Sequence, residues 1–248
     1  MPGLPRRVIS PRVSPAIVAI DGPAGAGKST VARQLARRLG FSMIDTGAIY
    51  RSVALAARRA GVGWDDDEGL RKLLDKGLPI SFVAEPEERV LLNGEDVTQA
   101  IRTPEISRGA SVVSARPVVR GKLLGLQRSL GLQASKGAVL EGRDIGTVVF
   151  PEATVKFFLT ASDDARAQRR HAEFSEKGLD VPLQEVLGDQ RRRDQHDRER
   201  AIAPLRAAPD AIVIDTTGLD LAEVVERSHR LALERLSQAS SIKGKLQR

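Results

Sequence analysis

The chain has 248 residues, of which 41% are hydrophobic, and it carries a formal net charge of +7 and no cysteine. This is the composition of an ordinary globular protein, and the lack of cysteine excludes disulfides, cysteine-ligated zinc and thiol chemistry. The three histidines form no close pair, so we expect no transition-metal site, and no apolar run approaches the length of a membrane span.

The N-terminal segment, residues 1–15, is rich in proline and arginine. It lacks the continuous apolar stretch of a secretory signal, so we expect a flexible tail and a cytoplasmic protein. The positive charge of the chain raises the question of a nucleic-acid partner. The arginines mostly alternate with aspartate and glutamate, which argues against a nucleic-acid-binding stripe. A pocket for small phosphates and a merely arginine-rich composition remain as explanations.

The first predicted elements are a strand at 17–20 and a helix at 31–39, joined by a loop of the form G-x-x-x-x-G-K-S. Strand, loop and helix in this order are the context of a phosphate-binding P-loop. The loop comprises Gly22, Pro23, Ala24, Gly25, Ala26, Gly27, Lys28, Ser29 and Thr30. Its glycines let backbone N–H groups face one concavity, Lys28 would reach the β- and γ-phosphates, and Ser29 would take a Mg²⁺ position. The alternative is a plain turn with a solvated Lys28; the flanking elements favour the nucleotide site.

The following elements alternate between strand and helix, which predicts an α/β fold with a parallel sheet. A strand at 41–44 precedes a helix at 45–60 and a weaker helix at 65–76. Short strand-like runs fill residues 78–97, and Asn93-Gly94 between two of them is typical of a hairpin, so we expect a small antiparallel insertion. Helical patterns follow at 98–102, 103–115 and 118–132.

The second half of the chain completes the predicted sheet and adds a helical hairpin. Strands are expected at 138–140, 155–159 and 211–215, then a last helix at 221–236 and a basic, mobile tail at 237–248. The polar loop 141–146 follows a strand, at the sheet edge where open α/β folds bind ligands. Ser162 predicts the start of an arginine-rich helix, and Gly178 and Pro182 separate it from a second charged helix ending near Arg200. This hairpin could close over bound phosphates as a lid.

Two groups of charged residues in this half have more than one interpretation. Arg193, Asp197 and Arg200 share a helical face, which is either solvated or, next to a P-loop, suited to stabilising phosphoryl transfer. Arg143-Asp144 combines a guanidinium that suits phosphate with a carboxylate that could accept a hydrogen bond from the N4 amine of cytosine. Asp144 could instead hold Mg²⁺ or cap the next turn.

Taken together, these segments resemble bacterial-type cytidylate kinases, which are nucleoside monophosphate kinases of the P-loop NTPase group. The resemblance spans about residues 16–236 and is carried by DGPAGAGKST at 21–30, DTGAIYR at 45–51, EGRDIGTVVFP at 141–151 and RDQHDRERAIAPL at 193–205. It implies a P-loop NTPase-like parallel sheet flanked by helices, in a single kinase domain at 16–236. A monophosphate-binding region with the β insertion would occupy about 61–115, and an arginine-rich helical lid about 162–200. The implied activity is ATP-dependent phosphorylation of CMP and dCMP to the diphosphates, with Mg²⁺.

The resemblance also implies roles for individual residues. Thr46, Ser111, Arg120 and Asp144 would surround the cytosine, with Tyr50 nearby, while Arg51 and Arg143 would hold the acceptor phosphate and Asp197 would meet the sugar hydroxyls. Arg193 and Arg200 would line the phosphate side, so that Lys28, Arg143, Arg193 and Arg200 are the expected catalytic cations. The chain departs from the family at Thr46, where serine is frequent, and at His196, where an arginine would add a cation near the lid.

The implied chemistry explains why no catalytic histidine or cysteine is apparent. A phosphate oxygen is already anionic near neutral pH, so the task is to align two polyanions and neutralise their repulsion. Kinases of UMP, AMP or shikimate share the P-loop, whereas a GTP-binding switch needs an N-K-x-D motif that the sequence lacks. A polynucleotide partner would give steeply salt-dependent binding. We expect a monomer that binds ATP, CMP and dCMP, and neither nucleic acid nor a membrane.

Overall fold

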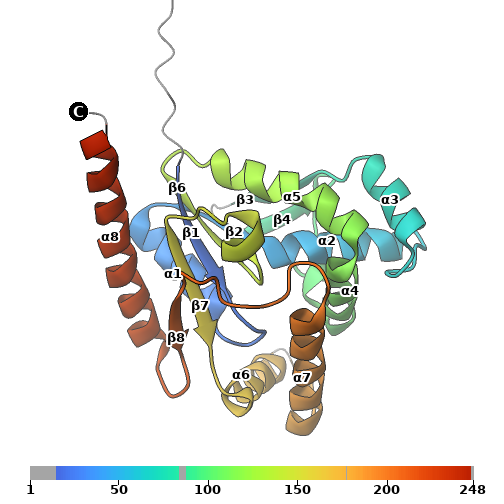
Figure 1. Cartoon of the computed structure of the whole chain (residues 1–248). Helices are drawn as coiled ribbons and strands as arrows, with labels where there is room; N and C mark the ends of the chain where they lie inside the picture. Colours follow the sequence, from blue (N-terminus) through green and yellow to red (C-terminus); the bar gives the residue numbers. More distant parts are fainter. Residues whose placement is uncertain (1–14, 84–87, 177, 247–248) are drawn as a thin grey trace, which may run out of the picture.

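A five-stranded parallel sheet lies at the centre of the computed structural model, which describes residues 15–83, 88–176 and 178–246 (Figure 1). The strand order is β2-β6-β1-β7-β8. These strands are β1 (Ala16–Asp21), β2 (Ser42–Asp45), β6 (Gly137–Gly142), β7 (Val155–Thr160) and β8 (Ile212–Asp215). All their pairings are parallel, so the strands end at one common edge of the sheet. The predicted α/β class is confirmed, whereas the predicted tail at 1–15 lies, except for Pro15, outside the described residues.

The central strand β1 is buried on both faces, as its nearly continuous apolar sequence predicts. Val18 and Ile20 pack toward α1 (Lys28–Leu39) and α8 (Leu221–Leu246), in a core that includes Phe157. Ile17 and Ala19 point to the opposite face, which is covered in part by α5 (Pro117–Leu132). Both faces of the sheet are therefore occupied, and its carboxyl edge is left for the loops that follow the strands.

The predicted antiparallel insertion is confirmed and packs within a helical subregion. Strands β3 (Ile80–Val83), β4 (Arg89–Leu92) and β5 (Glu95–Asp96) form a separate three-stranded sheet. Asn93 and Gly94 between β4 and β5 both have positive φ, 52° and 82°, as a tight hairpin turn requires. This sheet packs with the following helices into the largest apolar cluster: α2 (Thr46–Arg59), α3 (Asp67–Asp75), the short η1 (Ala100–Arg102) and α4 (Pro104–Ala115).

The predicted lid is a pair of helices, α6 (Asp163–Glu176) and α7 (Leu183–Glu199), near the carboxyl edge of the sheet (Figure 1). Ser162 caps α6 as expected, since its Oγ accepts a hydrogen bond from the backbone N–H of Ala165 at 3.2 Å. None of the helices within the described residues is both long and apolar enough to cross a bilayer.

Two local predictions were wrong. The last helix, α8, does not end at Leu236 but continues to Leu246, because the polar segment that follows Leu236 contains no proline to stop the helix. The segment 141–146, predicted as a polar loop, is irregular only at Arg143 and Asp144, since Glu141 and Gly142 belong to β6 and a helical turn begins at Ile145. Residues Ile145–Val149 form a single π-helical turn, in which Phe150 N–H donates to the Ile145 carbonyl at 2.7 Å.

Candidate active site

A cleft of about 770 Å³ opens at the carboxyl edge of the central sheet. Its walls come from the P-loop, the ends of β2 and β6, helix α4 and the two lid helices. The cleft brings together nearly all of the predicted site residues, which come from distant parts of the sequence. These are Ala24, Gly25, Ala26, Gly27, Lys28, Ser29, Thr30, Thr46, Tyr50, Arg51, Ser111, Arg120, Arg143, Asp144, Arg193, Asp197 and Arg200. Gly22 and Pro23 belong to the same loop but do not line the cleft.

The P-loop adopts a backbone path that depends on glycine. Gly22 has φ 148°, and a Cβ added there would lie 2.0 Å from the carbonyl oxygen of Leu159 on the neighbouring strand β7. Gly27, just before α1, has φ 82°. A larger side chain would be strained at these φ values and would clash at Gly22. Glycine at these positions therefore lets the loop wrap tightly over the start of α1. The geometry agrees with the phosphate-binding loop predicted from the sequence.

Lys28 is buried at the end of this loop, so it is not the solvated lysine of the alternative interpretation. Its Nζ donates a hydrogen bond to the carbonyl oxygen of Pro23 at 2.7 Å. Burial, together with the positive charge of Arg143, lowers the pKa of Lys28 to about 7, although Glu141 and other nearby carboxylates favour the charged form. An anion bound in the loop would restore the charge of this lysine.

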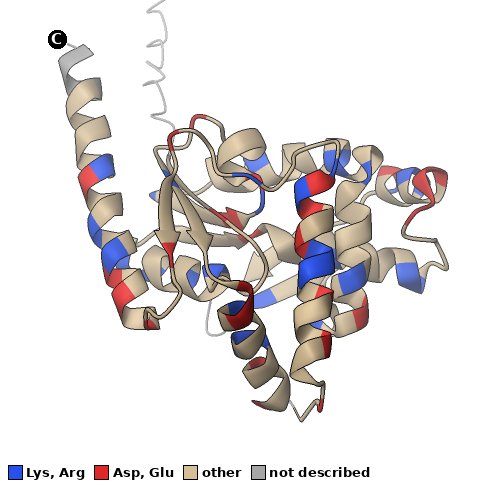
Figure 2. Ribbon diagram, turned by 60° about the horizontal axis from the view of Figure 1, so that its bottom comes forward, with Lys and Arg blue, Asp and Glu red and all other residues tan. Residues whose placement is uncertain are grey.

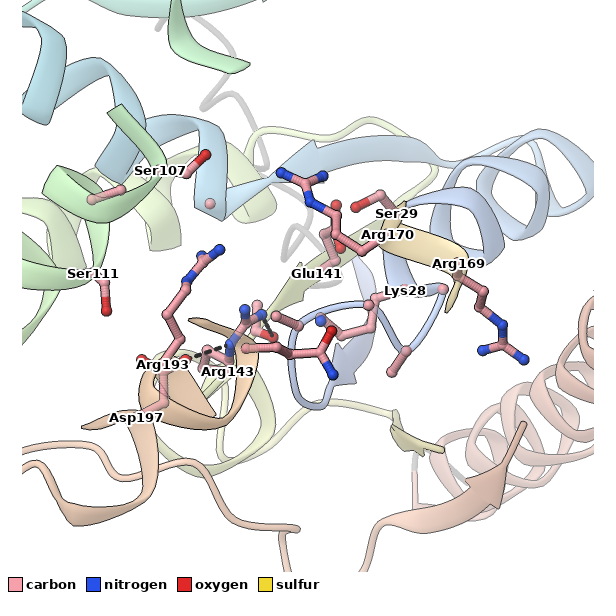
Figure 3. A pocket seen from close by; sticks show the side chains of 18 of the residues that line it. Lys28, Ser29, Ser107, Ser111, Glu141, Arg143, Arg169, Arg170, Arg193 and Asp197 are labelled. Carbon is pink, nitrogen blue, oxygen red and sulfur yellow. Dashed lines mark hydrogen bonds and ion pairs between the residues drawn. The ribbon is translucent and has the colours of Figure 1, made fainter. Parts of the chain in front are cut away.

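Glu141, the carboxylate next to the P-loop, was given no role by the sequence reasoning. It lies near the end of β6 in register with Ile20 of β1, and Figure 3 shows it close to Ser29 and Lys28. Its Oε1 is buried and has no hydrogen-bond partner among the described residues. Burial raises the pKa of this carboxyl, and the nearby Asp45 adds to the effect. The sequence signal that could have identified Glu141 is an acidic residue near the end of a strand, next to the P-loop strand.

Four further residues that line the cleft, Tyr50, Arg120, Asp144 and Arg200, form what we call the Asp144 cluster. Arg120 is paired with Asp144, and Arg200 Nη2 lies 3.3 Å from Asp144 Oδ1. The Arg120 guanidinium lies 5.7 Å from the centre of the Tyr50 ring. All four side chains are buried, and burial raises the pKa of Asp144 even though both arginines favour its charged form. The carboxylate is thus held in one orientation at the edge of the cleft.

Asp144 does not cap the turn that follows it, which removes one of the alternatives left open by the sequence. The N–H groups of Ile145 and Gly146 donate instead to Asp21 Oδ1 and Oδ2, at 2.8 and 2.7 Å. Burial raises the pKa of Asp21 to about 6 against the effect of these two bonds. Asp21 therefore positions the Arg143-Asp144 segment and leaves the Asp144 carboxylate free for the arginines and for a ligand.

Arg200 lines the cleft, but it does not share a helical face with Arg193. Helix α7 ends at Glu199, and Arg200 has an extended backbone with ψ 136°. The spacing argument placed Arg200 on one helical face with Arg193, but outside the helix that relation fails. Its side chain turns toward Asp144, and its Nε donates to the carbonyl of Ala203.

Three other arginines, Arg51, Arg143 and Arg193, also line the cleft. Arg143 Nε donates to Asp197 Oδ2 at 2.9 Å, and Arg51 Nη2 donates to Asp45 Oδ2 at 2.7 Å. Figure 3 shows Arg193 beside Arg143 and Asp197. The Nε atoms of Arg51 and Arg193 are buried and find no acceptor within the described part of the chain. Burial lowers the pKa of Arg193 to about 10, with a further contribution from Arg143. Crowded, buried cations of this kind favour a bound anion.

The remaining predicted residues lie at the rim and the floor of the cleft. Thr46 is buried, and its Oγ1 donates to the carbonyl of Glu141 at 2.6 Å. Ser111 on α4 and His196 on α7 face each other, with Oγ and Nδ1 3.2 Å apart. His196, noted in the sequence as a departure, thus bridges the lid and the insertion side of the cleft. Arg166 and Asp194, at the base of the lid, were not anticipated at all.

Comparison with known proteins gives a consistent result. The family model described as cytidylate kinase matches residues 18–233. Among similar proteins, the cytidylate kinase of Syntrophotalea carbinolica is 54% identical over 220 residues, which are 88% of this chain and 92% of that protein. The cytidylate kinase of Geobacter sp. strain M21 is 52% identical over 223 residues, 90% of this chain and 94% of that protein. The cytidylate kinase of Geobacter sulfurreducens is 54% identical over 220 residues, 88% and 93% of the two chains.

Proposed function

The chain belongs to the cytidylate kinase family, and on this premise we propose how its cleft transfers phosphate from ATP to CMP and dCMP, giving CDP and dCDP. The observation that carries the proposal is that three groups of charged residues line one cleft. They are Lys28 with the P-loop, the arginines Arg51, Arg143 and Arg193, and the Asp144 cluster, and Figure 3 shows Arg143 between Lys28 and Arg193. ATP at the P-loop and CMP at the Asp144 cluster would meet with their phosphates at these three arginines.

On the donor side, the P-loop backbone and Lys28 bind the ATP phosphates. Lys28 is held inside the loop by its bond to the Pro23 carbonyl, so its ammonium is close to the concavity before ATP arrives. The start of α1 adds the positive end of a helix dipole to the same place. These groups neutralise charge that develops on the transferred phosphoryl group.

The residues next to Lys28 fit the Mg²⁺ that accompanies ATP. Mg²⁺ prefers oxygen ligands and keeps waters and phosphate oxygens in most of its positions. The Ser29 hydroxyl and the buried Glu141 carboxylate, whose Oε1 has no partner among the described residues, are oxygen donors of this kind. Ser29 and Glu141 would hold the ion, which would offset the negative charge of the ATP phosphates.

On the acceptor side, Arg51, Arg143 and Arg193 hold the monophosphate. Arg143 is oriented by Asp197, and the Nε–H groups of Arg51 and Arg193 are donors without an acceptor in the described chain. No general base is required, because the attacking phosphate oxygen is already anionic. The arginines instead offset the repulsion between two polyanions and align them for in-line transfer.

Cytosine is selected by Asp144 in this proposal. Its carboxylate, held by Arg120 and Arg200, accepts a hydrogen bond from the N4 amine of cytosine. Uracil presents a carbonyl oxygen at the same position, which a carboxylate repels. Thr46, Tyr50 and Ser111 complete the base pocket, and Asp197 meets the sugar hydroxyls.

The proposal treats residues 16–236 as one kinase domain with a monophosphate-binding region at about 61–115 and a lid at about 162–200. It also includes a monomeric enzyme that acts on small molecules and binds neither nucleic acid nor a membrane. Since ATP and CMP are intracellular metabolites, it places the enzyme in the cytoplasm.

The test is phosphoryl transfer from MgATP to CMP, dCMP, UMP, AMP and GMP by the parent protein and by Asp144→Ala and Asp144→Asn. We expect CMP and dCMP to be preferred, and the variants to lose about 5- to 150-fold of the preference of CMP over UMP, as one base contact worth about 1–3 kcal/mol implies. Thermal melts identify variants that fail to fold. Asp164→Ala, which removes an exposed carboxylate of α6 outside the cleft, is the matched control. An unchanged preference in a folded Asp144→Asn protein would contradict the assignment of the base edge.

A further inference from the structure

Two charged residues at the base of the lid, Arg166 and Asp194, form hydrogen bonds with the backbone of the P-loop. Neither has a role in the transfer mechanism proposed above. Arg166 is near the start of α6 and Asp194 is near the end of α7, and they are 1% and 2% exposed. Arg166 Nη1 lies 2.5 Å from Asp194 Oδ2, so a buried ion pair joins the two lid helices.

Both polar backbone atoms of Ala24 are bound by this pair. Arg166 Nη1 donates to the Ala24 carbonyl at 2.8 Å, and the Ala24 N–H donates to Asp194 Oδ1 at 3.3 Å. The next residue, Gly25, is packed just as closely, since a Cβ added to it would lie 3.1 Å from Arg166 Cβ. The base of the lid is therefore in direct contact with the middle of the phosphate-binding loop.

The guanidinium of Arg166 is also hydrogen-bonded to the chain just after strand β7 and to the start of the lid helix α6. Its Nε donates to the carbonyl of Ala161, just after β7, at 3.1 Å, and its Nη2 donates to Asp163 Oδ1 at 2.6 Å. A buried ion pair adds little to stability compared with apolar side chains of similar size, but its hydrogen bonds are directional. The ion pair between Arg166 and Asp194 therefore fixes the position of the P-loop relative to both lid helices.

Asp194 belongs to the same helix as two residues of the acceptor site. Arg193 precedes it directly, and Asp197, which orients Arg143, follows within one turn. A rigid helix thus connects the contact on the donor loop to the groups that hold the acceptor phosphate.

We propose that Arg166 and Asp194 are positioning residues that set the P-loop and the acceptor-phosphate arginines in register for in-line transfer. The inference rests on the proposed function of the cleft. In-line transfer needs the reacting atoms within about 3–3.5 Å, and a misplacement of about 1 Å costs about 100-fold in rate. Because the pair does not line the cleft at the acceptor end, its loss affects the rate and the binding of ATP more than the binding of CMP.

The experiment compares Asp194→Ala and Asp194→Asn with the parent protein at a temperature at which circular dichroism shows all three folded. Asparagine keeps an acceptor for the Ala24 N–H but loses the charge that pairs with Arg166. We expect kcat to fall about 100-fold in Asp194→Ala and about 10-fold in Asp194→Asn, with KM for CMP within about twofold of the parent. Glu105→Gln, which removes an exposed ion pair with Arg58 outside the cleft, is the control and should leave kcat unchanged.

A second readout separates this inference from the proposed function. Calorimetric titration with ATP alone needs no acceptor, and we expect Asp194→Ala to bind ATP about tenfold more weakly because the loop loses its support. If the folded Asp194→Ala protein keeps kcat and ATP affinity within about threefold of the parent, the pair is only part of the scaffold and the proposal is overturned. An increase in KM for CMP as large as the fall in kcat would overturn it too. A parent protein that binds ATP but leaves CMP unphosphorylated would refute the proposed function, while the effect on ATP affinity would still test the pair.

Discussion

Lys28 is a buried lysine that is near its midpoint of protonation at neutral pH in the free protein. Burial and Arg143 lower its pKa from 10.5 to about 7. In the unfolded chain the residue stays protonated up to about 10.5, so between these pH values the unfolded state binds more protons and the contribution of Lys28 to folding stability rises with pH. ATP phosphates placed beside Nζ favour the charged form and raise the pKa again.

ATP binding should therefore take up a proton at alkaline pH. At about pH 8 Lys28 is mostly neutral in the free protein, and we expect an uptake approaching one proton, whereas at about pH 6 it should be small. Isothermal titration calorimetry in buffers of different ionisation enthalpy measures this number. Lys28→Met serves as the control because it retains only the titration of ATP itself. Equal proton uptake at both pH values would show that the lysine is already charged before ATP binds.

Among the elements, those with local signals were predictable from the sequence. The P-loop is specified by glycines that alone tolerate φ values such as 148° at Gly22, and the Asn93-Gly94 hairpin by residues that adopt positive φ. The parallel strands were evident as apolar runs between helical patterns. These features depend on neighbouring residues, and for that reason the sequence alone reveals them.

The features that the sequence did not reveal depend on residues far apart in the chain. The ion pair between Arg166 and Asp194 joins residues 28 positions apart. Each of them lies in a charged segment whose sequence suggests exposure to solvent. The π-helical turn at Ile145–Val149 is held by Asp21, which is more than a hundred residues earlier. Burial of a charge is decided by the tertiary fold, so periodicity cannot show it.

Gly109 lets the indole of Trp64, which follows α2, pack closely against α4. A Cβ added to Gly109 would lie 2.4 Å from Trp64 Cε2, and the indole N–H donates to the Ala54 carbonyl on α2 at 2.9 Å. We expect Gly109→Ala to lower the free energy of unfolding by about 1–3 kcal/mol, the usual cost of overpacking. Urea unfolding followed by the fluorescence of the single tryptophan measures it.

The control for that variant is another helical glycine, Gly121 on α5. It is exposed, and an added Cβ would meet no heavy atom of the described chain within 4 Å. Gly121→Ala should raise the free energy of unfolding by up to about 1 kcal/mol through helix propensity alone. Destabilisation by both substitutions would mean that the contact with Trp64 is not the cause.

For the molecule as a whole, the net charge of +7 is spread over a surface of mixed sign. Figure 2 shows basic and acidic residues interspersed along the helices, and many arginines are paired with carboxylates, such as Arg116 with Asp67 and Arg59 with Glu95. A nucleic-acid-binding protein instead presents a basic patch or stripe.

We therefore expect size-exclusion chromatography with light scattering to give the protein peak a mass of 26.8 kDa, both alone and with single- or double-stranded DNA at physiological salt. A shift to a larger mass on addition of DNA that disappears at high salt would contradict this expectation and support a polynucleotide partner. A larger mass without DNA would contradict the monomer.

The pairing of β1 with β6 has a consequence for the distance that the phosphoryl group must cross. Asp21 and Gly142 are partners in the sheet, and each is the last residue of its strand. The P-loop begins at the next residue on one strand, and Arg143 is the next residue on the other. Adjacent strands are about 4.8 Å apart, so the donor loop and the acceptor loop leave the sheet side by side at that separation. The backbone of the sheet thus fixes the separation at which the two loops begin, and the lid contacts act on parts of the loops beyond that point.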